Sequence, residues 1–350
     1  MRIAQIAPVW YPVPPPGYGG IELVVGLLAD GLVAAGHDVT LFASGGSTTK
    51  AELVTPLVNA PDPALLGNPW YDGFHAVSAY LGADDFDIVH DHAAIVGPAC
   101  GAMLRGRPPV VHTLHGPWTE ETRLFYSALD HIVHLVAISE AQRRDNSDAR
   151  YAATVHNGID IDQYAYTETK DDYLVYVGRA NPDKGPSVAI NVARRAGLPL
   201  KMILKRNEPA ERAYFEDAIA PLVTDQVELH ENVSHAEKVQ LLGRARAMIF
   251  PIRWPEPFGL VMVEAMACGT PVVTTNWGAA PELVEDGVTG YRRDDYADLV
   301  SAITLVDQLS PAACRARVEA EFSADAMVRK YAALYERIAD AAAPGFSLRP

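Results

Sequence analysis

Two carboxylates in the second half of the chain have surroundings suited to binding or catalysis. Glu256 stands in the loop Arg253–Leu260, and Glu264 lies in an apolar run that ends at Gly269, a residue type that commonly ends a helix. A charge among apolar residues needs a partner, and a carboxylate can accept two hydrogen bonds from the vicinal diol of a ribose or a hexose. The same two acids could also be the general acid and base of a hydrolase, because their spacing fits both roles.

Two cations follow the apolar run Tyr173–Val177, in the sequences Gly178-Arg179 and Lys184-Gly185. If this run is a strand, both cations lie at its carboxyl edge, where doubly wound sheets bind ligands. The fork of an arginine and the point charge of a lysine together suit a pyrophosphate. Two basic residues in a loop are also often plain solvated surface.

A glycine-rich segment, Gly17-Tyr18-Gly19-Gly20-Ile21-Glu22, joins the first apolar run to a helical pattern. Exposed backbone N–H groups and the start of a helix favour a phosphate at such a junction. The segment is not GxGxxG, because Glu22 takes the place of the third glycine, and GxxxxGK[ST] occurs nowhere in the chain. A tight turn without a ligand is the other interpretation.

Four histidines stand near the ends of two successive apolar runs, as His90 and His92 and as His112 and His115. Imidazoles brought together in this way could hold zinc in a hydrolase. The chain has no HExxH, and its three cysteines lack CxxC spacing. We therefore expect no metal site and three buried thiols.

The segments that would carry these residues alternate between short β-branched runs and helical patterns, which predicts right-handed βαβ units and parallel sheets. The first series has expected strands at Arg2–Ala7, Asp38–Ser44, Asp87–Asp91, Pro109–Leu114, Leu135–Ser139 and Ala153–His156, and helices at Glu22–Ala35 and Glu120–Leu129. The second has expected strands at Tyr173–Val177, Leu200–Leu204, Gln226–Leu229, Ala247–Pro251 and Pro271–Thr275, and helices at Pro186–Ala196, Ala210–Leu222, His235–Ala245 and Gly259–Ala267.

The predicted fold class is therefore α/β, with two Rossmann-like doubly wound domains facing across a cleft. A length of 350 residues suits two domains. We place the first at residues 1–165 and the second at 166–324, joined by the polar stretch Asp160–Asp172. The helix at about 325–345 can pack back across either domain, and we assign it to the first.

The net charge of −15 argues against a nucleic-acid partner, which would require a basic face. We see no apolar window of the roughly 18 residues that a membrane span needs, and the start MRIAQIAP lacks the pattern of a signal peptide. These features predict a cytoplasmic protein and leave peripheral membrane contact open.

Taken together, these motifs resemble the retaining glycosyltransferases of family 4, which have the GT-B fold of two Rossmann-like domains. The resemblance covers nearly the whole chain. It depends on the glycine segment, Thr113-Leu114-His115, His156-Asn157-Gly158-Ile159-Asp160, Gly178-Arg179 with Lys184-Gly185, and the family's Glu-x7-Glu pattern at Glu256 and Glu264.

The resemblance implies a role for each residue that matches the family pattern. Arg179 and Lys184 would hold the donor diphosphate, Glu264 the ribose hydroxyls, and Glu256 the transferred sugar around its 3-hydroxyl, with His115 near the reacting end of that sugar. Backbone groups of Phe258, Gly259 and Leu260 would contact the sugar or the phosphates, and Gly19 and Gly20 would close over phosphate and acceptor. Tyr18, His92 and Lys205 are accessory or acceptor-side candidates.

The resemblance thus predicts a retaining, metal-independent hexosyltransferase. Its co-substrate would be a nucleoside-diphosphate sugar, with UDP or GDP as the nucleotide, and no cofactor is expected. The acceptor would be a small molecule, a glycan or a lipid-linked hydroxyl.

A GT-B sugar-nucleotide epimerase or phosphorylase, and a non-catalytic nucleotide-sugar binding protein, are the alternatives. A dehydrogenase would need the missing GxGxxG. Lys205-Arg206-Asn207 departs from the glycines of many relatives and adds cations near the donor residues.

Overall fold

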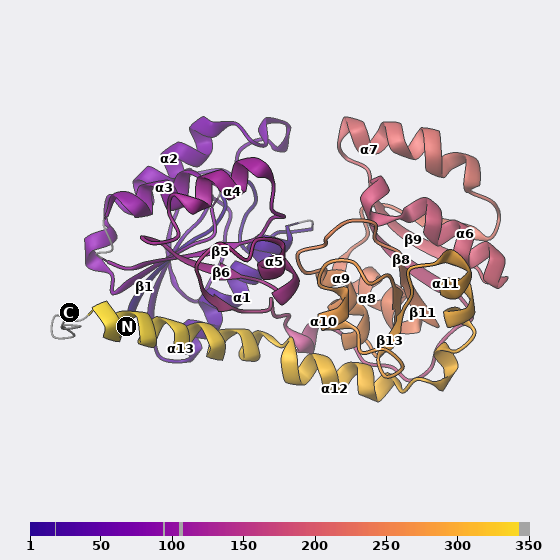
Figure 1. Cartoon of the computed structure of the whole chain (residues 1–350). Coiled ribbons are helices and arrows are strands. Elements are labelled where there is room, and N and C mark those ends of the chain that lie inside the picture. The colour runs from indigo at the N-terminus through magenta and orange to yellow at the C-terminus, as the bar shows by residue number, and fades with distance from the viewer. Residues whose placement is uncertain (18, 94, 105–107, 343–350) are drawn as a thin grey trace. The chain divides into compact units, whose positions relative to one another are not determined.

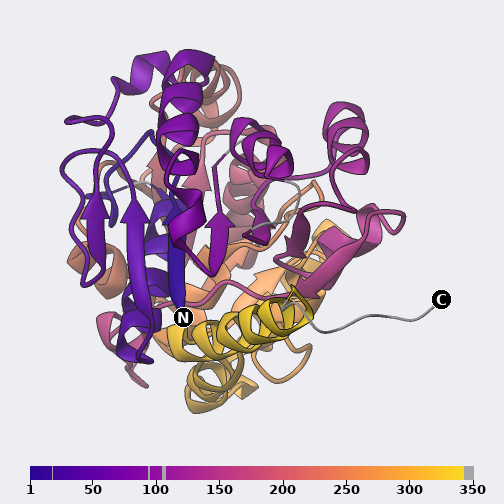
Figure 2. The ribbon, with the colours of Figure 1, turned by 90° about the vertical axis from the view of Figure 1, so that its left-hand side faces the viewer.

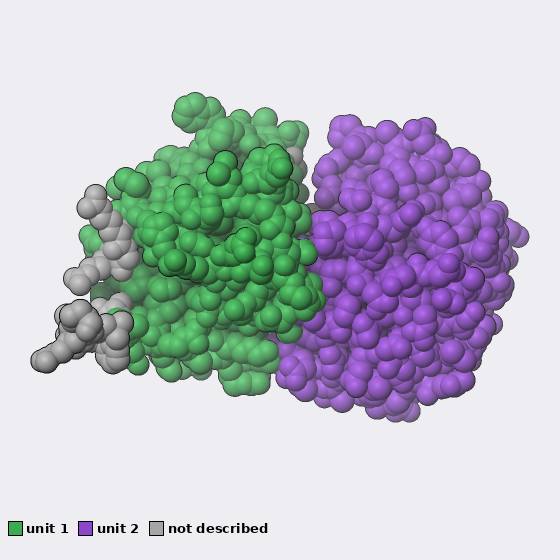
Figure 3. All heavy atoms as spheres, viewed as in Figure 1, with its two compact units in different colours: residues 1–158, 324–350 green, residues 159–323 purple. Residues whose placement is uncertain are grey.

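The chain forms two compact units in a computed structural model that describes residues 1–17, 19–93, 95–104 and 108–342 (Figures 1 and 3). Unit 1 contains Met1–Gly158 and the segment from Ala324 onward, and unit 2 contains Ile159–Ser323. The first boundary lies seven residues before the predicted one at 165. The difference arises because Tyr164 donates a hydrogen bond to Glu264 and its carbonyl accepts one from Arg315, and both partners belong to unit 2.

Unit 1 is built on a seven-stranded sheet in the order β3-β2-β1-β4-β5-β6-β7, and all its described pairings are parallel. The order reverses between β1 and β4, which marks the switch point where such sheets bind ligands. The short edge strand β3 was not predicted, and β7 begins two residues before the predicted run. The strands are β1 Arg2–Ile6, β2 Asp38–Phe42, β3 Glu52–Val54, β4 Ile88–Asp91, β5 Val110–Leu114, β6 His134–Ala137 and β7 Tyr151–Thr154.

The C-terminal helix α13 belongs to unit 1, as assigned from the sequence, and it packs against α1 (Figures 1 and 2). Gly31 makes this close approach feasible, because a Cβ there would lie 2.4 Å from Val328. Tyr331 and Tyr335 of α13 are fully buried. The α-helices of unit 1 are α1 Gly20–Ala34, α2 Pro69–Tyr80, α3 Val96–Met103, α4 Glu120–Ser127, α5 Glu140–Asp145 and α13 Ala324–Ala342.

Unit 2 repeats the architecture with a six-stranded parallel sheet in the order β10-β9-β8-β11-β12-β13, whose switch point lies between β8 and β11. The strands are β8 Leu174–Arg179, β9 Leu200–Lys205, β10 Val227–His230, β11 Ala247–Phe250, β12 Val272–Thr274 and β13 Gly290–Arg292. The α-helices are α6 Pro186–Ala196, α7 Pro209–Tyr214, α8 His235–Arg244, α9 Leu260–Ala267, α10 Ala280–Leu283, α11 Tyr296–Ile303 and α12 Pro311–Glu321.

The predicted helix Ala210–Leu222 is divided in the structure. The α-helix α7 ends at Tyr214, a π-helical turn covers Phe215–Ile219, and a 3-10 turn covers Ala220–Leu222. Pro221 lacks the N–H that a regular helix would use at this point, which explains the change of turn. Across the described residues, no helix is long and apolar enough to cross a bilayer.

Candidate functional site

At the switch point of unit 2, Lys184 and Glu256 form a partly buried ion pair. Lys184 lies in the turn before α6, and its Nζ is paired with Glu256 Oε2. The same ammonium lies 4.5 Å from the centre of the Trp254 ring, and Trp254 Nε1 donates to Glu256 Oε2 at 2.8 Å. Glycine is required at 185, because a Cβ there would lie 2.2 Å from the carbonyl oxygen of Pro251. The turn is thereby held against the end of β11, so these two predicted site residues do meet.

Arg179, the last residue of β8, faces two carboxylates that were not predicted as site residues. Its Nη2 donates to Glu208 at 2.8 Å and its Nε to Glu211 at 2.5 Å. Lys205 shares Glu208, at 3.6 Å. Burial raises the pKa of Glu211, but a backbone hydrogen bond at Glu208 and the Arg179 guanidinium outweigh burial and lower it. Both acids start α7, and helix starts favour carboxylates, a signal that the sequence does contain.

Glu264 on α9 is 4% exposed and has one carboxylate oxygen satisfied and one unsatisfied. Oε1 accepts from Tyr164 at 2.9 Å and from Lys238 Nζ at 2.8 Å. Oε2 is buried and has no hydrogen-bond partner among the described residues. Burial, followed by the Glu264 charge, raises the pKa of Tyr164, which therefore stays a donor. An unpaired buried carboxylate oxygen is costly, and it marks a place where a ligand donor would fit.

The loop between Glu256 and Glu264 is fixed by packing. Gly259 begins α9 at a φ of +99°, and a Cβ there would lie 2.5 Å from Met262 Cε. Phe258 is 3% exposed and meets the Phe322 ring edge-on, so its side chain belongs to the core. The N–H groups of Leu260 and Val261 at the start of α9 have no partner within the helix, whereas the Met262 N–H donates to the Gly259 carbonyl at 3.0 Å. The backbone of this loop can therefore donate hydrogen bonds even where its side chains cannot.

Unit 1 has a cavity of about 350 Å³ at the carboxyl ends of β1, β4 and β5. Gly19 and Gly20 lie on its wall, while Tyr18 lies outside the described residues. Gly19 has a φ of +150°, and a Cβ there would lie 2.8 Å from Pro15. The described residues that line the cavity are Pro8, Trp10, Tyr11, Gly19, Gly20, Ile21, Glu22, Leu66, Asp72, His92, Ala93, His112, Thr113, His115, Gly116 and Tyr126.

Two carboxyls of this cavity were not predicted as site residues. Glu22 is 5% exposed, and burial, partly offset by its own backbone N–H, raises its pKa to about 7. Burial also raises the pKa of Asp72, although a hydrogen bond of 3.1 Å from Trp10 Nε1 opposes the effect. In the sequence, Glu22 ends the glycine segment and begins the expected first helix, and neither feature predicts that its carboxyl is buried. Asp72 lies in a segment where the sequence analysis predicted no element.

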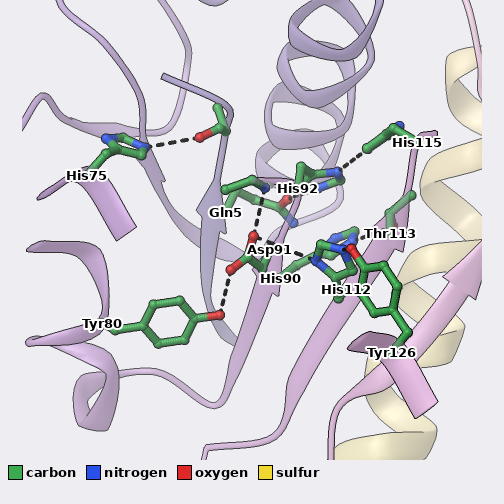
Figure 4. Close-up of polar contacts among 12 residues, drawn as sticks. Gln5, His75, Tyr80, His90, Asp91, His92, His112, Thr113, His115 and Tyr126 are labelled. Carbon is green, nitrogen blue, oxygen red and sulfur yellow. Dashed lines mark hydrogen bonds and ion pairs between the residues drawn. The ribbon is translucent and has the colours of Figure 1, made fainter. Parts of the chain in front are cut away.

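The four predicted histidines come together at the carboxyl ends of β4 and β5 (Figure 4), and His92, His112 and His115 line the cavity. His115 Nε2 lies 3.0 Å from His92 Nδ1, and His92 Nε2 lies 3.0 Å from Gln5 Oε1. Burial, with nearby His112, lowers the pKa of His115 to about 3, and burial holds the pKa of His92 well below its usual range. Both rings are therefore neutral at pH 7 and serve as hydrogen-bonding groups.

A second buried cluster lies beside them and is anchored on Asp91, which has no exposed surface. Asp91 accepts from Tyr80 at 2.7 Å and from the Ala93 N–H at 2.7 Å, as Figure 4 shows for Tyr80. His112 lies 3.7 Å from Asp91 and contacts the Tyr126 hydroxyl at 2.9 Å. Among the described residues, no group of three or more His, Cys, Asp or Glu side chains is arranged to hold a metal ion.

Two family models match consecutive parts of the chain. Residues 18–163 match the model described as Glycosyltransferase Family 4, and residues 160–315 match the model described as Glycosyl transferases group 1. The chain is 29% identical to a glycogen synthase of Mycobacterium tuberculosis, over 91% of this chain and 89% of that protein. It is 26% identical to a D-inositol 3-phosphate glycosyltransferase of Mycolicibacterium smegmatis, over 94% and 90% respectively.

Solved structures share the fold along the whole chain. A sucrose-phosphate synthase from Thermosynechococcus elongatus superposes with a TM-score of 0.77 at 21% identity, covering 98% of this chain and all of the other. Anabaena HepE in complex with UDP-glucose gives a TM-score of 0.72 at 20% identity, with 96% and 100% coverage. These similarities, together with the two parallel sheets, show the two-domain Rossmann-like GT-B fold.

Proposed function

The chain belongs to glycosyltransferase family 4, and we propose that it moves a hexosyl unit from a nucleoside-diphosphate sugar to an acceptor hydroxyl with retention of configuration and without a metal ion. The observation that carries the proposal is the unsatisfied Oε2 of Glu264. A ribose diol offers the hydroxyl donors that this buried carboxylate lacks. Lys238 is paired with the other oxygen of this carboxylate, Oε1, at 2.8 Å.

The diphosphate would be held by Arg179 and Lys184. Both cations are paired with carboxylates. A bound diphosphate would compete for the Lys184 ammonium and release Glu256 to accept a hydrogen bond from the sugar, around its 3-hydroxyl. Fixed cations and N–H donors from the start of α9 would then stabilise the charge on the departing phosphate. Such a site does not require a protein nucleophile, since the departing phosphate oxygen can take the acceptor proton.

A UDP sugar is the donor that we propose to test first. Anabaena HepE, which shares the fold, was solved with UDP and with UDP-glucose. GDP is the second candidate, because none of the residues named above for the donor site is assigned to contact the nucleobase and so to select between uracil and guanine.

The identity of the acceptor does not follow from the relatives, because their names point to glycogen in one case and to D-inositol 3-phosphate in another. We propose an uncharged, polyhydroxylated acceptor group bound in the cavity of unit 1. Glu22 and Asp72 can exchange hydrogen bonds with hydroxyls, and Trp10 and Tyr126 offer ring surfaces. None of the described residues that line the cavity is Lys or Arg, so a phosphate would meet carboxyls there without a cation.

The first experiment is a thermal-shift series with UDP, GDP, ADP and their sugar conjugates, each with and without EDTA. A bound ligand raises the melting temperature of the native protein. We expect a selective shift by one nucleoside diphosphate that EDTA does not change. A shift that requires metal would contradict the metal-free proposal, and no shift with any nucleotide would contradict the donor site.

Product analysis then separates transfer from the alternatives. A transferase yields a glycoside with retained configuration only when an acceptor such as maltose or inositol is present. An epimerase alters the donor without any acceptor, and a binding protein leaves it unchanged.

A further inference from the structure

We propose that Gln5 and Tyr335 are positioning residues that hold His115 as the tautomer protonated on Nε2, with Nδ1 left as a hydrogen-bond acceptor. His115 lines the cavity of unit 1, and Nδ1 has no hydrogen-bond partner among the described residues, whereas Nε2 contacts His92. Gln5 lies on β1 and Tyr335 on α13, at opposite ends of the sequence. The chain of contacts that links them to His115 gives each hydrogen bond a direction.

The first step starts at the Gln5 amide. Its nitrogen donates to the Tyr335 hydroxyl at 3.1 Å, and its oxygen faces His92 Nε2 at 3.0 Å. An amide oxygen can only accept, so His92 carries its proton on Nε2. A neutral imidazole has one N–H, which leaves His92 Nδ1 as an acceptor. His115 Nε2, 3.0 Å from that atom, must therefore donate.

The second step continues from Tyr335 in the same direction. The Tyr335 hydroxyl lies 2.5 Å from His90 Nδ1. The Gln5 NH2 group can only donate, so His90 Nδ1 is the acceptor for the hydroxyl proton among these contacts. His90 Nε2 then donates to Thr113 Oγ1 at 2.8 Å, and Thr113 meets the Tyr331 hydroxyl at 2.8 Å. Apart from His115 at the cavity wall, every residue in this series of hydrogen bonds is fully or almost fully buried, so water does not compete for these bonds.

The third step concerns charge. Each hydrogen bond in this series has one direction only if every imidazole is neutral and so has one N–H. Burial together with the neighbouring imidazoles lowers the pKa of His90, His92 and His115, which keeps them neutral. Gln5 supplies an uncharged acceptor where a carboxylate would favour the imidazolium. The titratable groups packed around the three imidazoles are Tyr331 and Tyr335 of the hydrogen-bonded chain itself and, outside it, Asp91 and His112.

The consequence for the reaction depends on the proposed function. With Nδ1 as acceptor, His115 would take a hydrogen bond from a hydroxyl of the sugar or of the acceptor and orient it. The low pKa of His115 makes it an orienting group rather than a base that ends up protonated.

The test is nitrogen NMR on histidine-labelled, ligand-free protein, which reads each tautomer directly whether or not the protein transfers sugar. We expect a protonated Nε2 and a bare Nδ1 in His115. In Tyr335→Phe, the Gln5 NH2 group loses its acceptor, so the Gln5 amide can rotate by 180° and present its nitrogen to His92. The protons of His92 and His115 would then shift, and we expect the Nδ1–H form of His115 to become populated. Tyr331→Phe is the matched control: it removes a hydroxyl from the same helix at the far end of the chain, and we expect the tautomer to be unchanged.

Turnover should follow the tautomer. We expect kcat of Tyr335→Phe to fall about tenfold, the effect of weakening one oriented hydrogen bond, with UDP affinity unchanged. Nδ1–H in wild-type His115, or an unaltered tautomer in Tyr335→Phe, would overturn the proposal. If transfer activity is absent while the tautomers behave as expected, the proposed function fails and the positioning role stands.

Gln5→Glu provides an independent readout if Tyr335→Phe does not fold. A carboxylate would accept from His92 and favour its charged form, so the pKa of His92 should rise in an NMR titration. An unchanged pKa would show that Gln5 does not set the charge state of this pair.

Discussion

The candidate sites of the two units lie at the same place in the same kind of sheet, yet they treat charge differently. In the candidate site of unit 2, Arg179, Lys184 and Lys238 each have a carboxylate partner, as in Lys184 with Glu256 and Lys238 with Glu264. In unit 1 the imidazoles of His92 and His115 are neutral, and no described cation pairs with the Glu22 carboxyl. The difference indicates which ligand each unit can accept.

A cation that is paired with a carboxylate at a half-buried site can exchange that carboxylate for a diphosphate at a low cost in free energy, because one anion replaces another beside it. A lone buried carboxyl has no such exchange available. It avoids the cost of burial either by taking up a proton or by meeting hydroxyl donors. Unit 2 is thus suited to a charged ligand and unit 1 to a neutral one.

The largest expected effect is the loss of the central cation of unit 2. Lys184→Ala should lower kcat by about 10²- to 10³-fold, because charge on the departing phosphate would no longer be neutralised. Lys201→Ala is the control, since Lys201 is also a half-exposed lysine paired with a glutamate, at 3.4 Å from Glu228, but lies outside the proposed site. Steady-state kinetics would measure both, and equal rates for the two variants would refute the diphosphate role.

The matching change in unit 1 removes the lone carboxyl. Burial raises the pKa of Glu22 from 4.5 to about 7. Ionising this carboxyl therefore opposes folding, and this free-energy cost is absent below pH 4.5, where the carboxyl is protonated in both the folded and the unfolded state. As pH rises from 4.5 to 7, this cost grows to about 3 kcal/mol. Glu22→Gln should remove it, so the variant should gain stability over wild type across that range. Urea unfolding at several pH values would measure the difference.

A difference that stays constant between pH 4.5 and 8 would mean that Glu22 has a partner or is hydrated in solution. The contrast between the two units would then not hold. Glu282→Gln is a suitable control, because this carboxylate is also partly buried and near a helix start but lies in unit 2.

A smaller effect is expected at the unsatisfied oxygen of unit 2. Glu264→Gln retains the side-chain volume but removes the charge that a ribose diol would meet, and affinity for UDP should fall about tenfold. Isothermal titration calorimetry would measure it, with Glu228→Gln as an exposed control. Unchanged affinity would show that the ribose binds elsewhere.

These comparisons depend on features that the sequence reveals to different degrees. Buried parallel strands are continuous apolar runs, so β1, β4, β8 and β11 could be predicted closely. The three-residue strands β3 and β13 have no such pattern and were missed. Lys184 and Glu256 could each be chosen in advance as candidate site residues because each follows an expected strand, but their ion pair was not predicted.

The partners of the site residues were harder to foresee. Lys238 reaches Glu264 from α8, and Tyr335 reaches Gln5 from 330 residues away. Nothing local in the sequence marks such contacts, because they arise only when distant segments pack together. Glu22 shows a related limit: its motif was visible, but its burial was not.

The smallest expected effect tests how far the paired charges of unit 2 extend. Lys205 was considered as an extra cation of the donor site, and it lies 3.6 Å from Glu208, which Arg179 also contacts. The Glu208 side chain is 43% exposed, and an ion pair at such a site contributes about 1 kcal/mol or less. Because Arg179 keeps Glu211 as a second partner, Lys205→Ala should leave its guanidinium in place and change kcat/KM by less than about threefold. A much larger loss in steady-state kinetics would place Lys205 among the residues that contact the donor.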